Sequence, residues 1–274
     1  MTFKLTGPLV LAGAGKMGGA MLKGLLAKGL DAKSVIIQDP APPAEVAEFA
    51  KHHAIQIVPQ IGKLAVPPAV IIAAVKPQVM EAVFPPLARL AGPGTLVISI
   101  AAGRSIASFE KHLAPGIAVV RAMPNTPAAI GRGITICAGN AHVTKTQRQL
   151  ANDLLSAVGE VGWIDDEALM DAVTAVSGSG PAYVFLLAEC LAEAGRKAGL
   201  DEALAIRLAR ATVSGSGELL AQSDLDPATL RQNVTSPGGT TAAALAVLMA
   251  PDGLQDLLTK AVAAAVKRGQ ELAK

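Results

Sequence analysis

The stretch LVLAGAGKMGGAMLKGLLAKG, residues 9–29, decides the fold class of this 274-residue chain. An apolar run at its start reads as a strand, and the later part has the apolar spacing of a helix. Between them stand three glycines in GxGxxG register. Gly13 allows a tight turn, Gly15 lets a pyrophosphate approach the main chain, and Gly18 lets the helix pack closely. The stretch therefore predicts a dinucleotide site, and the alternative is an ordinary strand-to-helix turn.

Further apolar runs rich in valine and isoleucine alternate with helical patterns over the first half of the chain. Such continuous runs are typical of parallel strands that are buried on both faces. A last short strand is expected near residues 134–138, followed by a helix over 145–158. The arrangement predicts an α/β, Rossmann-type doubly wound sheet. The expected strands are 9–12, 35–39, 69–75, 95–100 and 117–123.

After Trp163 the pattern becomes helical to the end of the chain. We therefore expect a dinucleotide-binding domain over residues 1–162 and an all-helical domain for substrate binding and dimerisation over 163–274. The alanine-rich composition of these helices favours association with a second copy.

Composition argues against several classes of protein. The 24 basic and 22 acidic residues leave a net charge of +2, which gives nucleic-acid binding little support. No uninterrupted apolar run reaches the roughly 18 residues of a membrane span, so we expect no membrane association. Cys137 and Cys190 have no CxxC spacing and are expected to be buried, as suits a reducing cytoplasm. The four histidines show no metal spacing, and no metal site is expected.

The segment SPGGTT, residues 236–241, precedes a helical run and predicts an anion site. The first N–H groups of a helix have no intrahelical partner and attract negative charge. Gly238 and Gly239 give a ligand access to the main chain, and the hydroxyls of Ser236, Thr240 and Thr241 add donors. A carboxylate would suit this site. The alternative is a loop that caps only its own helix.

Six blocks follow one another along the chain: GAGKMG (13–18), AVKP (74–77), SIAAG (99–103), RAMPNTP (121–127), SGSGPAY (177–183) and SPGGTT (236–241). In this order and spacing they resemble the pyrroline-5-carboxylate reductase family. The resemblance covers nearly the whole chain and implies reduction of the cyclic imine 1-pyrroline-5-carboxylate to L-proline, the last step of proline biosynthesis, with NADPH or NADH. It also implies a homodimer, with assembly into a decamer as an extension.

The resemblance also assigns roles to residues. The segment 236–241 would bind the substrate carboxylate through main-chain N–H groups and the Ser236 hydroxyl. Thr241 would hydrogen-bond the ring nitrogen, which makes it the candidate catalytic residue; the alternative for Thr241 is helix capping. From its position alone, Arg121 is expected to pair with a carboxylate at the domain interface; the alternative is a contact with a ligand. The implied cofactor-binding residues are Gly13, Gly15, Lys16, Met17, Gly18, Ala74, Val75, Lys76, Pro77, Ala101 and Asn125.

Asp39 bears on the choice of cofactor. It ends the second expected strand, where an acidic side chain would hydrogen-bond the adenosine ribose of NAD and repel a 2′-phosphate. Many members of the family prefer NADP, whereas the segment QDPAPP carries no basic residue. We expect NADH to be usable and leave strict preference open; the alternative for Asp39 is a turn residue before Pro40.

Two other functions fit parts of the sequence. A β-hydroxyacid dehydrogenase would need a catalytic lysine in the helical domain, and the nearest candidate, Lys197, lies at the far end of a long helix from SGSGPAY. A protein that binds nucleotide without catalysis would have no need of a second anion site, which the intact SPGGTT segment provides.

Overall fold

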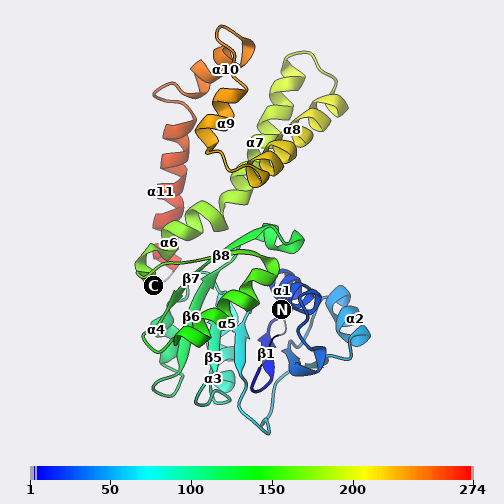
Figure 1. The fold of residues 1–274 in the computed structure, drawn as a ribbon, viewed down its shortest axis with the longest axis vertical. Coiled ribbons are helices and arrows are strands. Elements are labelled where there is room, and N and C mark those ends of the chain that lie inside the picture. Colours follow the sequence, from blue (N-terminus) through cyan, green and yellow to red (C-terminus); the bar gives the residue numbers. More distant parts are fainter. Residues whose placement is uncertain (1–2, 4, 273–274) are drawn as a thin grey trace. The chain divides into compact units, whose positions relative to one another are not determined.

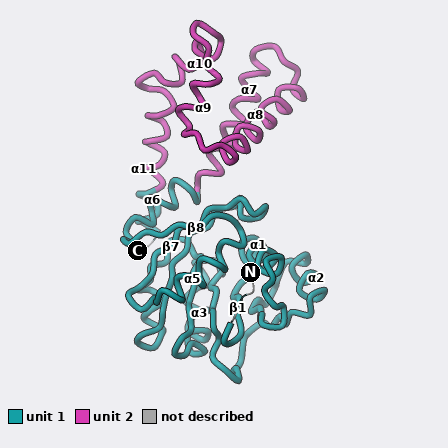
Figure 2. Tube along the Cα trace, in the orientation of Figure 1, with its two compact units in different colours: residues 1–178, 266–274 teal, residues 179–265 magenta. Residues whose placement is uncertain are grey.

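The computed structural model describes residue 3 and residues 5–272. The chain divides into two compact units (Figure 2). The first unit contains the chain up to Gly178 together with the segment from Val266 onward, and the second contains Ser179–Ala265. The predicted boundary at 162–163, which rests on the change from strand patterns to helical patterns, stays a prediction.

The first unit is built on a sheet that is flanked by helices (Figure 1). The sheet has eight strands in the order β3-β2-β1-β4-β5-β6-β7-β8. Neighbouring strands are parallel except for β6 and β7, which are antiparallel. The chain moves outward from β1 in both directions, so the point where the strand order reverses lies between β1 and β4. The strands are β1 (Leu9–Ala12), β2 (Val35–Gln38), β3 (Gln56–Val58), β4 (Val70–Ala73), β5 (Leu96–Ser99), β6 (Ala118–Met123), β7 (Gly133–Gly139) and β8 (Gly159–Trp163).

Helices cover both faces of this sheet because successive strand residues point to opposite sides. Leu9 and Leu11 of β1 pack into one core, while Val10 and Ala12 pack into the other. The first core is closed by α1 (Lys16–Ala27), α2 (Ala44–His52) and α5 (Lys145–Leu155). The second is closed by α3 (Met80–Ala88), α4 (Ile106–Glu110) and α6 (Met170–Val173).

The expected strands of the parallel part are confirmed, and the structure adds features that the sequence pattern did not predict. β3 and β8 are only partly buried, so neither has a continuous apolar signal. The reversal at β7 follows from chain length, because residues 124–132 are fewer than the dozen or so residues that a parallel crossover needs.

The first unit is completed by the end of the chain. The last helix, α11, runs over Leu254–Leu272, and its final part from Val266 belongs to the first unit. Gly269 lies so close to Asp171 that a Cβ there would stand 3.1 Å from the carboxylate oxygen Oδ1. A π-helical turn, Thr174–Gly178, ends the first segment of this unit.

The second unit consists of helices, as expected, but it has almost no core of its own. Gly195 packs against Leu200 and Ala205, which brings α7 and α8 together. Among its described apolar residues, only Ala205 and Ala209 are buried. Four consecutive residues of α7 are 46–62% exposed: Val184, Phe185, Leu186 and Leu187. The helices are α7 (Gly180–Lys197), α8 (Glu202–Gln222), α9 (Pro227–Asn233), α10 (Thr240–Leu248) and the first part of α11.

One helical stretch among the described residues, 167–197, is long and apolar enough to cross a membrane by length and composition. Only 6% of its most apolar window is buried. A helix that another copy covers in an oligomer has the same length and composition.

The two cysteines differ in environment. Cys137 is buried in β7, as predicted, but Cys190 is exposed in α7, so that prediction was wrong for the isolated chain. Apolar neighbours in the sequence signalled burial at Cys190, yet α7 has too few neighbours in the second unit to cover it.

We predict that the Cys137 thiol does not react while the protein is folded. Burial raises its pKa to about 12, with the Arg148 charge acting in the opposite direction, so almost no nucleophilic thiolate exists at neutral pH. Peptide mapping after treatment with a thiol reagent should show Cys137 modified only in denaturant. Modification at equal rates in folded and denatured protein would contradict its burial.

Candidate dinucleotide and anion sites

The predicted cofactor residues of the first unit follow the carboxyl ends of parallel strands. β1, β2, β4, β5 and β6 all end at the same edge of the sheet. Ligands of open α/β sheets bind outside this edge, at the point where strand order reverses. Here that point lies between the glycine turn after β1 and the segment Ala74–Pro77 after β4.

The glycine turn has the geometry that its three glycines predict. Gly13 has a φ of 91°, and a Cβ there would stand 2.7 Å from the Ala74 carbonyl oxygen. At Gly18 a Cβ would stand 2.2 Å from the Gly13 carbonyl oxygen, so helix α1 begins in close contact with the turn. At Gly15 no atom beyond its chain neighbours lies within 4 Å of the Cβ position. Two glycines therefore serve packing, and one leaves the main chain open.

Helix α1 begins at this open position. Gly15 is its N-cap residue, no side chain caps it, and no acidic residue stands in its first turn. Lys16 is exposed and Met17 is half-buried. Uncapped N–H groups at a helix N-terminus, beside a backbone without a side chain, form an arrangement that suits a phosphate group.

The segment after β4 closes against this turn. The Ala74 N–H donates to the Ala12 carbonyl (2.7 Å), which continues the pairing of β4 with β1 beyond the strands. Ala74, Val75 and Pro77 are half-buried, while Lys76 is exposed. Within the described part of the chain, the Lys76 ammonium has neither an ion-pair partner nor a hydrogen bond. Its charge is thus available to a ligand at this edge.

Ala101 and Asn125 follow β5 and β6 at the same edge. Ala101 is buried, so its methyl group serves the core and its contact with a ligand is limited to the main chain. Asn125 is half-buried, and its Oδ1 accepts a hydrogen bond from the Ile134 N–H (3.0 Å). This bond fixes the loop after β6 against the start of β7.

Asp39 lies directly beside the glycine turn. Its Oδ2 accepts a hydrogen bond from the Ala14 N–H (2.8 Å), and its Oδ1 accepts one from the Ala41 N–H (2.9 Å). The second bond is the Asx-type turn that precedes a proline-rich segment, and the first ties the carboxylate to the cofactor turn. Asp39 therefore forms the turn before Pro40 that one interpretation predicts. Its carboxylate also lies beside the glycine turn, where the interpretation as a ribose-binding residue needs it.

The predicted anion segment lies in the second unit. Gly239 is the N-cap of α10, no side chain caps this helix, and the Gly239 N–H donates to the Ser236 carbonyl (3.0 Å). Gly238 has a φ of 69° and open space where a Cβ would stand. In the described structure, the hydroxyls of Ser236, Thr240 and Thr241 make no hydrogen bond to another residue. Neither Ser236 nor Thr241 caps the helix.

Arg121 is paired with a carboxylate, as expected. This buried side chain of β6 donates from Nη1 to Oε1 of Glu167 (2.9 Å). The same oxygen accepts the Ile106 N–H (2.9 Å) at the start of α4. Glu167 was not among the predicted residues, because the acidic run 165–167 reads as an exposed turn. It joins β6, α4 and the helical segment after β8.

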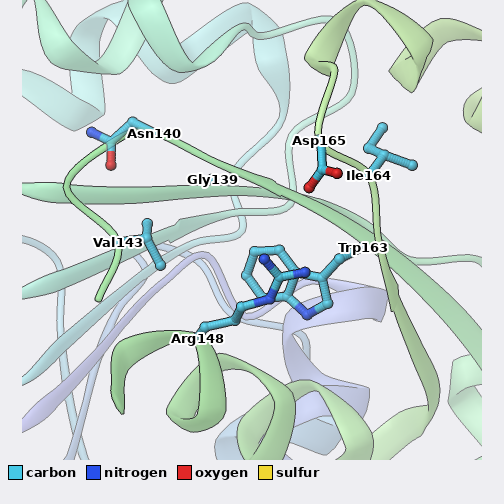
Figure 3. A pocket seen from close by; sticks show the side chains of 7 residues that line it. All are labelled: Gly139, Asn140, Val143, Arg148, Trp163, Ile164 and Asp165. Carbon is cyan, nitrogen blue, oxygen red and sulfur yellow. The ribbon is translucent and has the colours of Figure 1, made fainter. Parts of the chain in front are cut away.

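A surface pocket of about 110 Å³ lies elsewhere on the first unit (Figure 3). The Arg148 guanidinium lies flat over Trp163, 4.3 Å from the ring centroid, and the indole Nε1 donates to Oδ1 of Asn152 (2.7 Å). Asn140 in its lining donates from Nδ2 to the carbonyl of Ile117 (3.0 Å), the residue just before β6 begins. The pocket is therefore at the opposite sheet edge from the glycine turn, and it is smaller than the roughly 300 Å³ typical of ligand sites. No group of three or more metal-ligating side chains occurs among the residues described.

Two family models match the chain. Residues 167–272 match "Pyrroline-5-carboxylate reductase dimerisation", and residues 9–103 match "NADP oxidoreductase coenzyme F420-dependent". These ranges contain the predicted anion segment and the glycine turn, respectively.

Curated relatives and solved structures agree with the first of these models over the whole chain. Pyrroline-5-carboxylate reductases of Pseudomonas aeruginosa and of a Synechocystis strain are 43% and 44% identical, over 97% of this chain and 96% and 98% of theirs. The structure of the Coxiella burnetii enzyme has a TM-score of 0.90 at 35% identity and covers 98% of this chain and 99% of that one. A Plasmodium falciparum pyrroline carboxylate reductase, solved with NADP bound, has a TM-score of 0.80 at 29% identity, with 99% and 100% covered. The chain belongs to the pyrroline-5-carboxylate reductase family.

Proposed function

We propose that the carboxyl edge of the first unit binds NADH or NADPH and that the segment Ser236–Thr241 binds 1-pyrroline-5-carboxylate, which the enzyme reduces to L-proline. The observation that carries this proposal is the pair of uncapped helix N-termini, one at Gly15 and one at Gly239. Each offers free N–H groups beside a glycine, and the two suit the two anionic groups of the reaction, a pyrophosphate and a carboxylate.

The residues of the first unit fit the cofactor. The opening at Gly15 admits a pyrophosphate close to the N-terminus of α1, and Lys76 provides a cation that has no partner among the residues that the structure describes. When bound, the nicotinamide supplies the hydride. The protein holds the nicotinamide in place through the loops after β4, β5 and β6, so positioning is the main contribution of this unit.

The segment Ser236–Thr241 would bind and polarise the substrate. The N–H groups at the start of α10 and the Ser236 hydroxyl receive the carboxylate. The Thr241 hydroxyl is half-exposed and hydrogen-bonds the imine nitrogen, which makes the imine carbon a better hydride acceptor. A threonine is a weak acid, so water or a proton already on the substrate completes the amine.

Steady-state oxidation of NADH and of NADPH with 1-pyrroline-5-carboxylate tests the proposal directly. Turnover with either cofactor supports it. Folded protein that binds nucleotide and turns over no cyclic imine would refute it.

The dehydrogenase alternative gains no support from Lys197, which is exposed at the end of α7 and whose Nζ lies 3.5 Å from Oε1 of Glu193.

Replacement of Thr241 by valine should lower kcat/KM for the imine by about tenfold or more. The change removes one hydrogen bond to the reacting group. A loss of about 1.4 kcal/mol of transition-state stabilisation corresponds to a tenfold fall in kcat/KM, while nucleotide affinity should stay near that of the wild type. Thr235→Val is the matched control, because the Thr235 hydroxyl already donates to the Arg231 carbonyl (2.6 Å). Equal kcat/KM in Thr241→Val and wild type would remove Thr241 from the mechanism.

We further propose that the protein is a cytoplasmic homodimer that forms through its helical part. The exposed apolar helices of the second unit support the dimer, and a match to a dimerisation model over 167–272 supports the same region. Cysteines without a disulfide support a reducing compartment. Association of dimers into a decamer is the further step that the resemblance implies.

A further inference from the structure

We propose that Asp39 makes this chain select NADH over NADPH. The inference rests on the proposed nucleotide site and specifies which adenosine ribose that site accepts. It concerns the end of β2 and the two loops beside it, and it uses only residues of the first unit.

The main chain fixes the position of Asp39. Its N–H donates to the Val58 carbonyl of β3 (3.0 Å), and the Gly13 N–H donates to the Gln38 carbonyl (2.9 Å). β2 therefore stays paired on both sides up to its last residue. The carboxylate of Asp39 therefore lies at the sheet edge, directly beside the glycine turn. In this fold the adenosine half of a dinucleotide lies there.

The carboxylate itself is also held. One oxygen accepts the Ala14 N–H and the other accepts the Ala41 N–H, at 2.8 and 2.9 Å. Two carboxylate oxygens can accept about four hydrogen bonds, so each keeps capacity for one more. A ribose with free 2′- and 3′-hydroxyls would donate to them. A 2′-phosphate carries about −1.5 to −2 charges and offers acceptors only, so it would be repelled.

The segment Pro40–Pro43 and the loop after β3 contain a single cation, Lys63, that could offset that repulsion. The segment Pro40–Pro43 has no basic side chain, and its three prolines have no N–H. In the loop after β3, the Ile61 N–H already donates a hydrogen bond to Oε1 of Gln38 (2.9 Å), so it is not available to a phosphate. The Ile61 side chain is buried. The nearest cation along that loop is Lys63, which is exposed. Lys63 is therefore the one side chain of these loops that could receive the phosphate, and it serves as a test.

The experiment measures binding and turnover in parallel for the full-length wild type, Asp39→Ser, Asp39→Asn and Lys63→Ala. Dissociation constants for NADH, NADPH, ADP-ribose and 2′-phospho-ADP-ribose come from calorimetry without any imine present. Values of kcat/KM for both cofactors come from assays with 1-pyrroline-5-carboxylate. A failure of the imine reaction would leave the binding comparison intact, so the two proposals can fail separately.

We expect the wild type to bind NADH and ADP-ribose at least tenfold more tightly than their 2′-phosphorylated forms. Asp39→Ser should reduce that ratio at least tenfold. If Asp39→Ser lowers the affinity for all four ligands equally, the loop has lost the hydrogen bonds that hold it. The affinity ratio of Asp39→Asn then decides, because this variant keeps a hydrogen-bond acceptor and removes the charge. A wild type that favours the phosphorylated ligands, or a ratio unchanged in Asp39→Asn, would overturn the proposal. So would a Lys63→Ala variant that loses affinity for the phosphorylated ligands alone, since we expect its ratio to equal that of the wild type.

Discussion

Replacement of Phe185 by glutamate is expected to convert the protein to monomers and to lower its activity at least a hundredfold. Phe185 stands in the run 184–187 of α7, in which every side chain is about half exposed or more. Four consecutive helix residues point in four directions around the axis, so α7 is apolar on several sides and α8 covers only part of it. A helix of this kind is stable in water only when a partner covers it.

The size of the effect follows from the charge. An uncompensated charge buried in an interface destabilises it by about 3–5 kcal/mol. A symmetric dimer contains this charge twice, once from each copy. The second unit has only Ala205 and Ala209 buried, so it has no core that would hold Ser236–Thr241 in place without the partner. We therefore expect the anion site to be lost together with the dimer.

Sedimentation velocity and the imine assay would measure both effects. Val66→Glu is the matched control, because it places the same charge at an isolated apolar residue of the first unit that is 50% exposed. We expect its mass and kcat/KM to match the wild type. A Phe185→Glu protein that stays dimeric would show that the contact between copies lies on another face.

Alanine at Gly18 and alanine at Gly15 should weaken nucleotide binding by different routes. At Gly18 the new Cβ would stand 2.2 Å from the Gly13 carbonyl oxygen, so the turn must move. Overpacking of this kind destabilises a protein by about 1–3 kcal/mol, and the displaced turn should bind NADH and NADPH roughly a hundredfold more weakly. Both the melting temperature and the affinity should fall.

At Gly15 the Cβ position is free and φ is −64°, a value that alanine adopts readily. The melting temperature should therefore remain within about 1–2 °C of the wild type, or rise slightly, since alanine restricts the unfolded chain. Nucleotide affinity should still fall, because the methyl group occupies the space that we assign to the pyrophosphate. Unchanged affinity in Gly15→Ala would place the pyrophosphate elsewhere.

The parallel part of the sheet could be predicted because burial on both faces leaves a continuous apolar run. Residues 70–73 and 96–99 are fully buried and carry that signal at full strength. β3 and β8 could not be predicted in this way, since partial burial lets polar residues such as Gln56 and Glu160 interrupt the run. The direction of β7 depends on the length of a connection, which no residue pattern encodes.

The candidate site could be predicted where local backbone geometry determines it. The distinct roles predicted for Gly13, Gly15 and Gly18 follow from their register alone, and the structure shows close packing at Gly13 and Gly18 and open space at Gly15. Contacts between distant segments could not be predicted. Glu167 reaches Arg121 across 46 positions of sequence, and nothing in the run 165–167 distinguishes it from its neighbours.

The order in which the ribosome makes this chain matters for the first unit. Its sheet is complete once β8 has emerged, but the part of α11 that belongs to this unit, with Gly269 beside Asp171, is synthesised only after the whole second unit. Domains usually fold in the order in which they leave the ribosome. Here the first unit lacks its α11 segment until the whole second unit has been translated. A nascent chain that stops early therefore leaves the surface beside Asp171 exposed, in addition to an incomplete second unit.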